Sequence, residues 1–213
     1  MGLVKKIVFT KCEVDGTHQV PLAGKRLPHT LNRIGFHVSW GIMGIEKKGV
    51  SIGDISIRDV FKPGDLGMVI HLHGLLYAKE YGYQTCFESY VAKTVHEFYQ
   101  RFDPELDRIW LCEHNGKLVG SLFLMHREEN TAQLRFFLIR PEYRGLGLGK
   151  LLMDRFMTAL RELGYSSAFL WTERELVAAA SLYTRHGFRL TEQKESAIFG
   201  RPATEVRYDL AGV

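Results

Sequence analysis

The feature that most constrains this chain is a glycine-rich turn between an apolar run and a helix pattern. The apolar run, residues 136–139, ends just before Pro141, and the turn Arg144-Gly145-Leu146-Gly147-Leu148-Gly149 leads into the helix pattern. Glycines at alternate positions remove side chains that would keep a ligand away from the backbone. Amide groups at a helix start have no intrahelical partner and lie at the positive end of the helix dipole. The turn therefore predicts an anion site, most often one for phosphate.

The spacing of the turn excludes two common phosphate motifs. A P-loop needs Gly at the position of Arg144 and Ser or Thr after Lys150, where this sequence has Leu151. The dinucleotide-binding pattern G-x-G-x-x-G would need Gly in place of Lys150. What fits is Arg-x-x-Gly-x-Gly, formed by Arg144, Gly147 and Gly149. Taken alone, this pattern is also compatible with an ordinary glycine-rich turn between a strand and a helix.

Length and composition indicate a soluble globular protein. With 213 residues, the chain suits one domain with an extra segment, and 46% hydrophobic and 24% charged residues are ordinary proportions. The net charge of +4 suits an acidic ligand without indicating nucleic acid. Three unclustered cysteines, Cys12, Cys86 and Cys112, argue for a reducing compartment and against a disulfide framework or a metal site. No apolar run approaches the roughly 20 residues of a membrane span, and we expect a cytoplasmic protein.

Two regions differ in their patterns, and we expect a domain boundary between them. Residues 1–54 show short strand-like runs, basic residues and scattered glycines but no sustained helical period. They suit a small β appendage, a segment that packs on a partner, or a poorly ordered tail. Residues 55–213 carry clear patterns, and we expect them to form the main domain.

The patterns after residue 55 predict a mixed sheet in an α+β domain. Asp65 is the expected N-cap of the first helix, Asn115-Gly116 predicts a hairpin, and Gly120 predicts a bulge or a close backbone approach. A capping box, Thr172 to Glu175, is expected to start the last helix. In chain order we expect a strand at 55–60, helices at 65–81 and 85–101, strands at 109–113, 118–124 and 132–139, a helix at 147–163, a strand at 167–171, a helix at 175–185, and strands from 188 and at 204–210.

This order, with Arg144-x-x-Gly147-x-Gly149 after the fourth strand and Tyr183-Thr184-Arg185-His186-Gly187-Phe188 later, resembles the GNAT N-acetyltransferases over about residues 55–210. The resemblance implies a twisted mixed sheet, splayed between strands four and five and flanked by helices. The stretches 63–67 and 73–82 resemble, more closely, the acetyltransferase half of fusions with MarR-type regulators. Because the segment before residue 55 is too short for the regulator half and lacks its helices, we infer no DNA binding.

The resemblance also implies a co-substrate, acetyl-CoA, and the residues that bind it. Its pantetheine arm would pair with the backbone of Phe137, Leu138 and Ile139. Tyr183 would protonate the departing thiolate, and Arg174 would meet a CoA phosphate. The pyrophosphate would lie on the amides of the loop, where Arg144 adds charge or fixes the loop: Arg144, Gly145, Leu146, Gly147, Leu148, Gly149 and Lys150.

The resemblance leaves the general base and the acceptor unassigned. Many members carry a glutamate in or near strand four, where this chain has Arg135; Glu113, His126 and His71 are weak candidates. Many also carry Asn near the start of the helix after strand five, where this chain has Glu173 or Arg174. We therefore expect an N-acetyltransferase for a primary amine of a small molecule or peptide, with a non-catalytic acetyl-CoA-binding or protein-interaction module as the alternative.

The acceptor would bind between the first two helices and the loop 194–202. Tyr77, Tyr81 and Phe199 in this region hint at an apolar or aromatic acceptor, although they would also serve as core residues. Because members of the family often dimerise, a homodimer is compatible with the resemblance.

Overall fold

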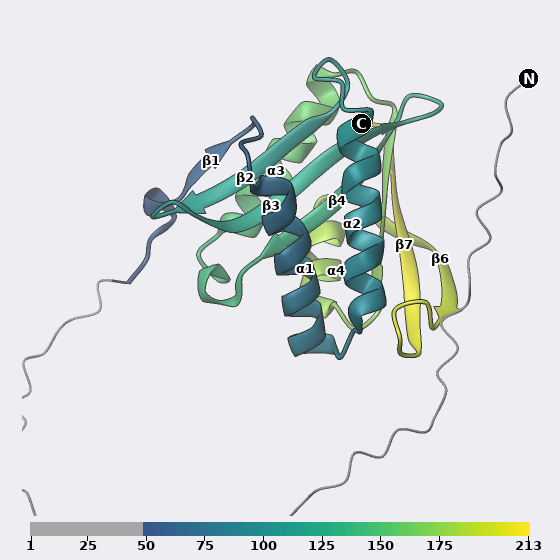
Figure 1. The fold of residues 1–213 in the computed structure, drawn as a ribbon. Helices are drawn as coiled ribbons and strands as arrows, with labels where there is room; N and C mark the ends of the chain where they lie inside the picture. Colours follow the sequence, from purple (N-terminus) through teal and green to yellow (C-terminus); the bar gives the residue numbers. More distant parts are fainter. Residues whose placement is uncertain (1–48) are drawn as a thin grey trace, which may run out of the picture. The chain divides into compact units, whose positions relative to one another are not determined.

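A seven-stranded mixed sheet forms the centre of the computed structural model, which describes residues 49–213 (Figure 1). The strands lie in the order β1-β2-β3-β4-β5-β7-β6, and all neighbours are antiparallel except β4 and β5. Their bounds are β1 Ser56–Arg58, β2 Arg108–His114, β3 Lys117–Arg127, β4 Thr131–Ile139, β5 Ser167–Glu173, β6 Arg189–Ser196 and β7 Ala203–Ala211. The predicted mixed sheet is confirmed. The predicted segment 1–54 lies almost entirely outside the described residues.

Four helices cover the two faces of the sheet, and each pair buries its own apolar cluster. Helices α1, Asp65–Tyr81, and α2, Thr85–Gln100, lie on one face (Figure 1). Helices α3, Leu148–Glu162, and α4, Val177–Arg185, lie on the other. Two 3-10 turns complete the described elements, η1 at Ile52–Asp54 and η2 at Pro141–Tyr143. None of the helices within residues 49–213 is long and apolar enough to cross a membrane.

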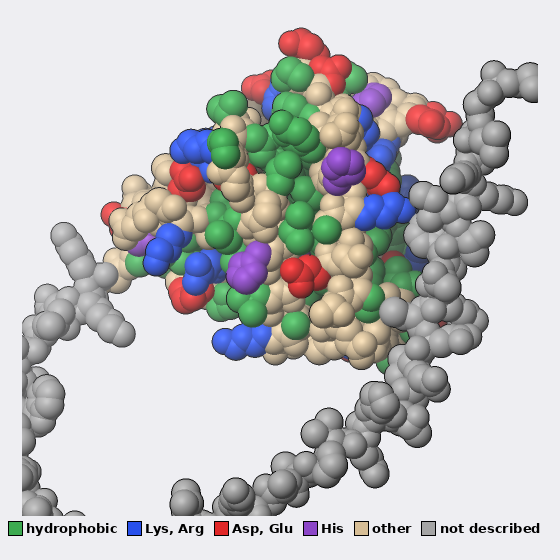
Figure 2. All heavy atoms as spheres, in the orientation of Figure 1, with side chains coloured by type: hydrophobic (Ala, Val, Ile, Leu, Met, Phe, Trp, Pro, Cys, Tyr) green, Lys and Arg blue, Asp and Glu red, His purple; other side chains and the backbone are tan. Residues whose placement is uncertain are grey.

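Apolar side chains at helical spacing explain how α2 and α3 pack. The predicted stripe of α2 is buried, from Phe87 through Val91 and Val95 to Phe98. The predicted stripe of α3 is buried at Leu152, Phe156 and Leu160. Figure 2 shows the face that carries α1 and α2, where apolar side chains lie among charged ones. This mixed solvent side is expected for helices whose apolar stripe faces a sheet.

A bulge in β4 makes alternate residues of this strand change from one face of the sheet to the other. Ala132 and Leu134 lie in the cluster beneath α3 and α4, whereas Phe136 and Leu138 lie in the cluster beneath α1 and α2. The register with β3 shifts between Ser121 and Phe123, and Phe136 has a left-handed φ of 49°. An extra residue in one strand moves every later side chain to the opposite face. The bulge therefore lets β4 supply apolar side chains to both clusters.

Two predictions that depend on glycine residues, the hairpin turn before β3 and the close approach at Gly120, are confirmed. Asn115 and Gly116 both have positive φ, 51° and 70°, as the tight hairpin between β2 and β3 requires. A Cβ atom at Gly120 would lie 3.1 Å from the carbonyl oxygen of Leu138. Glycine at position 120 thus allows β3 and β4 to approach closely just after the bulge.

Two predicted helix caps are wrong. The residue before α1 is Gly64, with a left-handed φ of 97°, and the Asp65 carboxylate instead binds Arg58 and the amide N–H of Lys62. The expected capping box before α4 is absent, because the helix begins at Val177 after Leu176, which makes no side-chain cap. Strand β5 continues to Glu173 and takes up the residues that the capping box was expected to use.

Candidate functional site

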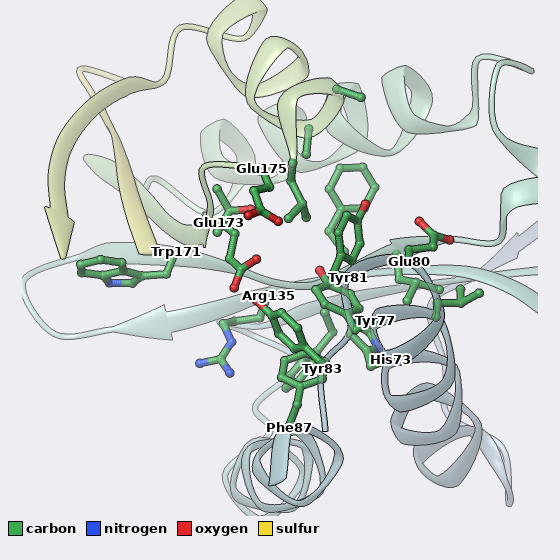
Figure 3. Close-up of a pocket in the computed structure, with 18 of the residues that line it drawn as sticks. His73, Tyr77, Glu80, Tyr81, Tyr83, Phe87, Arg135, Trp171, Glu173 and Glu175 are labelled. Carbon is green, nitrogen blue, oxygen red and sulfur yellow. The ribbon is translucent and has the colours of Figure 1, made fainter. Parts of the chain in front are cut away.

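A cleft of about 800 Å³ opens where β4 and β5 separate (Figure 3). The two strands pair only through residues 131–133 of β4 and 167–169 of β5, so the splay that the resemblance implies is present. The cleft is lined by residues 133–139 of β4, by the end of β5, and by side chains of α1, α2 and α4. Lys194 of β6, Glu205 of β7 and Phe199 between these strands complete the wall. The sheet thus offers an elongated groove with access to backbone groups.

Phe137, Leu138 and Ile139 all line this cleft. Their strand is bound to β3 on one side, whereas pairing with β5 ends at Gln133. Among the described residues, the later part of β4 therefore has no strand partner on its β5 side. Unpaired strand edges bind extended chains through main-chain hydrogen bonds. The geometry suits an extended arm with amide groups.

The bulge beside this edge is held by a buried hydroxyl. Ser121 is 2% exposed and donates a hydrogen bond of 2.6 Å from Oγ to the carbonyl oxygen of Phe136. That carbonyl belongs to the residue with φ of 49°, a conformation that costs free energy in any residue other than glycine. The hydrogen bond therefore stabilises the strand distortion that turns Phe137 and Ile139 toward α3.

The glycine-rich turn adopts the backbone that the sequence predicts. Gly145 and Gly147 have left-handed φ angles of 79° and 89°, and Gly147 is the N-cap of α3. A Cβ atom at Gly149 would lie 3.4 Å from Leu182 of α4 and 3.5 Å from Ile139. The first amides of α3 have no side-chain cap, as an anion site at a helix start requires. Gly145 and Gly149 also line the cleft.

Arg144 fixes this turn. Its Nε atom donates to the carbonyl oxygen of Ile139 at 2.9 Å, and its two terminal nitrogens bind both carboxylate oxygens of Glu80, each at 2.9 Å. The guanidinium is thus engaged by α1 and by the end of β4. Of the two roles predicted for Arg144, these contacts match the structural one.

The other side chains of the turn do not face the cleft. Leu148 is buried in the core, and Leu146 packs against the same cluster. Lys150 extends along its own helix to Asp154, with Nζ 2.6 Å from the carboxylate. Leu146, Gly147 and Leu148 therefore offer backbone amides to the predicted anion site.

Tyr183 lies in the wall of the cleft on α4 and is 5% exposed. Its ring packs near Phe137, Phe188 and Tyr208, with centroids 6.2 to 6.3 Å away. Burial, together with the nearby phenol of Tyr208, raises the pKa of Tyr183 above that of an ordinary phenol. The hydroxyl is therefore protonated at neutral pH and can act as a proton donor.

Arg174 lies apart from the residues above. Its side chain is exposed and donates to the amide oxygen of Gln193 on β6, outside the cleft lining. The neighbouring residue, Glu173, is 5% exposed and lines the cleft. Arg174 is the first residue after β5, and its contact with Gln193 draws its side chain toward β6 instead of the cleft.

The three base candidates from the sequence do not line the cleft. Glu113 is paired with Arg58, His126 interacts through Nδ1 with the Tyr165 hydroxyl, and His71 is on the exposed side of α1. The carboxylates that do line it are Glu80, Glu173, Glu175 and Glu205.

Sequence reasoning missed Glu205 and the role of Glu173. Glu205 lies on β7 and comes to lie opposite Glu173 only when β5 and β7 pair. The available signal was an acidic residue at the end of β5 and another near the start of β7.

Aromatic side chains form much of the wall on the side of α1 and α2, including the predicted Tyr77, Tyr81 and Phe199. Tyr77 stacks on His73, with ring centroids 6.0 Å apart. Burial lowers the pKa of His73 to about 4, even though its hydrogen bond to the Val69 carbonyl opposes this shift. His73 is therefore neutral at physiological pH. Within residues 49–213, no three His, Cys, Asp or Glu side chains are grouped to hold a metal ion.

Comparison with known proteins identifies the family and the fold. Residues 69–188 match the model of the Acetyltransferase (GNAT) family. An uncharacterized N-acetyltransferase of Schizosaccharomyces pombe is 42% identical over 143 residues, which are 65% of this chain and 85% of the relative. The mycothiol acetyltransferase of Beutenbergia cavernae is 34% identical over 89 residues. These cover 41% of this chain and only 29% of that protein, so the likeness is confined to a part of it.

Among solved structures, a GNAT acetyltransferase from Elizabethkingia anophelis with acetyl-CoA bound has the same fold. Its TM-score is 0.52 at 13% identity, with 74% of this chain and 98% of the other covered. At this identity the likeness establishes the fold alone. The matched family segment, by contrast, includes β4, the glycine-rich turn and Tyr183.

Proposed function

Because the chain belongs to the acetyltransferase (GNAT) family, we propose that it transfers the acetyl group of acetyl-CoA to a primary amine of a small molecule or peptide. The observation that carries this proposal is the separation of β4 from β5 after residues 131–133, beside a helix start with two left-handed glycines. A groove with a free strand edge at one side and an anion site at its end suits a long, phosphorylated co-substrate.

In this proposal acetyl-CoA lies along the free edge of β4. Its pantetheine amides pair with the backbone of Phe137, Leu138 and Ile139, and its pyrophosphate meets the amides from Arg144 to Lys150. The two glycines support this placement, because their left-handed φ angles shape a turn with outward amides. Arg144 contributes by holding the turn to Glu80 and Ile139.

The transfer itself requires one proton donor. The acceptor nitrogen first gives its ammonium proton to solvent; as an uncharged amine it then attacks the thioester carbonyl carbon and forms the C–N bond, after which the C–S bond breaks. The sulfur takes the phenolic proton of Tyr183, and the proton that the nitrogen loses restores the phenol. The place of Tyr183 in the wall of the cleft supports this role, because its phenol is protonated at neutral pH and can give that proton to the thiolate.

A calorimetric titration with acetyl-CoA, followed by a thiol-release assay over a panel of primary amines, tests the proposal. We expect micromolar binding and thiol release that depends on the amine. Binding without amine-dependent release would favour the non-catalytic alternative, and no binding at high micromolar acetyl-CoA would reject both. The likeness to the acetyltransferase half of MarR-type fusions, the boundary near residue 55, a homodimer and a cytoplasmic location stay predictions from the sequence.

A further inference from the structure

Two glutamates that line the cleft lie directly opposite each other on neighbouring strands. Glu173 ends β5 and pairs in register with Glu205 of β7. Their side chains are only 5% and 13% exposed. Like charges opposite each other on neighbouring strands destabilise a sheet, and burial adds to the cost. A pair in this position therefore needs a compensating positive charge.

The chain supplies only part of that charge. The Oε2 atom of Glu173 accepts from Arg201 at 2.7 Å, and the Oε2 atom of Glu205 lies 3.6 Å from Lys194 Nζ. Arg201 is shared with Glu175, which it binds at 2.9 Å. Lys194 is shared as well, because it lies 4.4 Å from the centroid of the Trp171 ring. Each glutamate of the pair thus has one oxygen engaged by the chain.

The second oxygen of each glutamate is buried without a partner. In residues 49–213, four buried side-chain nitrogen or oxygen atoms have no hydrogen bond, and three of them belong to this cluster: Glu173 Oε1, Glu205 Oε1 and Arg201 Nε. Buried polar atoms in native proteins are nearly always paired. Two open carboxylate oxygens on facing strands are acceptors, so the missing partner is a donor of hydrogen bonds, and the local charge favours a cation.

The position of the two glutamates in the cleft indicates that the missing hydrogen-bond donor belongs to a bound acceptor. Both glutamates line the cleft, and Figure 3 shows Glu173 reaching in from the side opposite Tyr77 and Tyr81. Burial is the main cause that raises the pKa of both phenols, and the negative charge of Glu173 adds to it. An acceptor that enters here meets carboxylates on one side and aromatic rings on the other.

We propose that Glu173 and Glu205 bind the acceptor through its positively charged nitrogen, with its apolar part against the aromatic wall. The acceptor class is therefore a cationic amine with an apolar or aromatic body, and this inference rests on the proposed acetyl transfer. An ammonium group has three donors, so it can satisfy both open oxygens at once. A neutral or anionic acceptor would leave the two oxygens without a donor of matching charge.

The test compares amines with their uncharged counterparts. The full-length chain is titrated at pH 7.5, without acetyl-CoA, with 2-phenylethylamine, tyramine and hexylamine, each beside the alcohol that replaces its amine by hydroxyl. We expect at least one amine to bind tenfold more tightly than its alcohol. If all three amines bind no better than their alcohols, the proposal is overturned. This measurement does not depend on acetyl transfer, so it can fail or succeed independently of the proposed function.

Substitutions then assign the effect to the pair. Glu205→Gln and Glu173→Gln should each weaken binding of the preferred amine about tenfold, whereas acetyl-CoA affinity should change less than twofold. Glu192→Gln is the matched control, because Glu192 is an exposed glutamate on the neighbouring strand β6.

Glu205→Gln is the decisive variant, because it removes one of two opposed charges and leaves the contact between Arg201 and Glu173 in place. Its thermal unfolding is measured alongside. Unchanged amine affinity in folded Glu205→Gln, with acetyl transfer intact, would refute the inference and leave the proposed function standing.

Discussion

Replacing Ser121 by Ala tests how the distortion of β4 is maintained. In the wild type the Ser121 hydroxyl donates to the Phe136 carbonyl at 2.6 Å in a site that is 2% exposed. Alanine removes the donor without changing the rest of the side chain, so the carbonyl loses this bond at a residue whose φ is 49°. The bulge would then have to persist without its side-chain hydrogen bond or to relax.

The expected cost follows from the burial of the carbonyl. Leaving a buried acceptor unpaired costs about 1–3 kcal/mol. The strain of a left-handed residue, about 1–2 kcal/mol, is already present in the wild type and does not add to this loss. We expect the free energy of unfolding to fall by about 2 kcal/mol. For a domain of this size that corresponds to roughly 4–8 °C in the unfolding temperature. Relaxation of the bulge would also turn Phe137 and Ile139 away from α3, so acetyl-CoA affinity should fall as well.

Urea unfolding followed by circular dichroism measures the change, with Ser166→Ala as the matched control. Ser166 also donates from Oγ to a backbone carbonyl, that of Asn130 at 3.2 Å, but it is exposed to solvent. Water can replace that hydrogen bond, so the control should lose less than about 0.5 kcal/mol. Equal losses in both variants, or a loss below about 0.5 kcal/mol in Ser121→Ala, would refute the role of the hydroxyl in holding the bulge.

Three further predictions concern single residues. Tyr183→Phe should lower kcat by about 10²-fold or more with little change in acetyl-CoA affinity, and an unchanged kcat in steady-state assays would exclude Tyr183 as the acid. Gly147→Ala should lower the free energy of unfolding by about 1–2 kcal/mol and weaken acetyl-CoA binding. A Cβ would have room, but alanine is strained at a φ of 89°. Stability and affinity equal to those of the wild type would refute the role of this left-handed turn in binding. His73, with a pKa of about 4 when folded against an ordinary 6.5, binds fewer protons folded than unfolded. Stability should therefore fall as pH drops from 6.5 toward 4, by at most about 3 kcal/mol, and urea midpoints of His73→Gln should depend less on pH.

Local patterns allowed much of the fold to be predicted from the sequence. The stripe of α2 and the hairpin at Asn115 and Gly116 depend on residues close in sequence, and both are confirmed. The glycine-rich turn is local in the same sense, because its left-handed positions are set by glycine itself. The caps of α1 and α4 failed for a different reason. The Asp65 carboxylate had a stronger partner in Arg58, a strand residue, which no local pattern reveals.

Features that depend on strand pairing could not be predicted. The bulge at Phe136 lies in a run that is apolar on both faces, so the alternation carries no sign of a change in phase. The pair formed by Glu173 and Glu205 requires the register of β5 with β7. Arg201 reaches this pair from the connection between β6 and β7, a contact over 28 residues with Glu173. Sequence reasoning therefore found the expected acetyl-CoA side of the cleft better than the acceptor side.

Hydrogen exchange of the backbone amides, with and without acetyl-CoA, tests where the co-substrate binds. We expect acetyl-CoA to slow exchange at residues 137–139 of β4 and at the amides from Gly145 to Lys150, with little change in β1 and β2. Protection at distant elements, or none at these two segments while acetyl-CoA is bound, would contradict the placement of the co-substrate in the gap between β4 and β5.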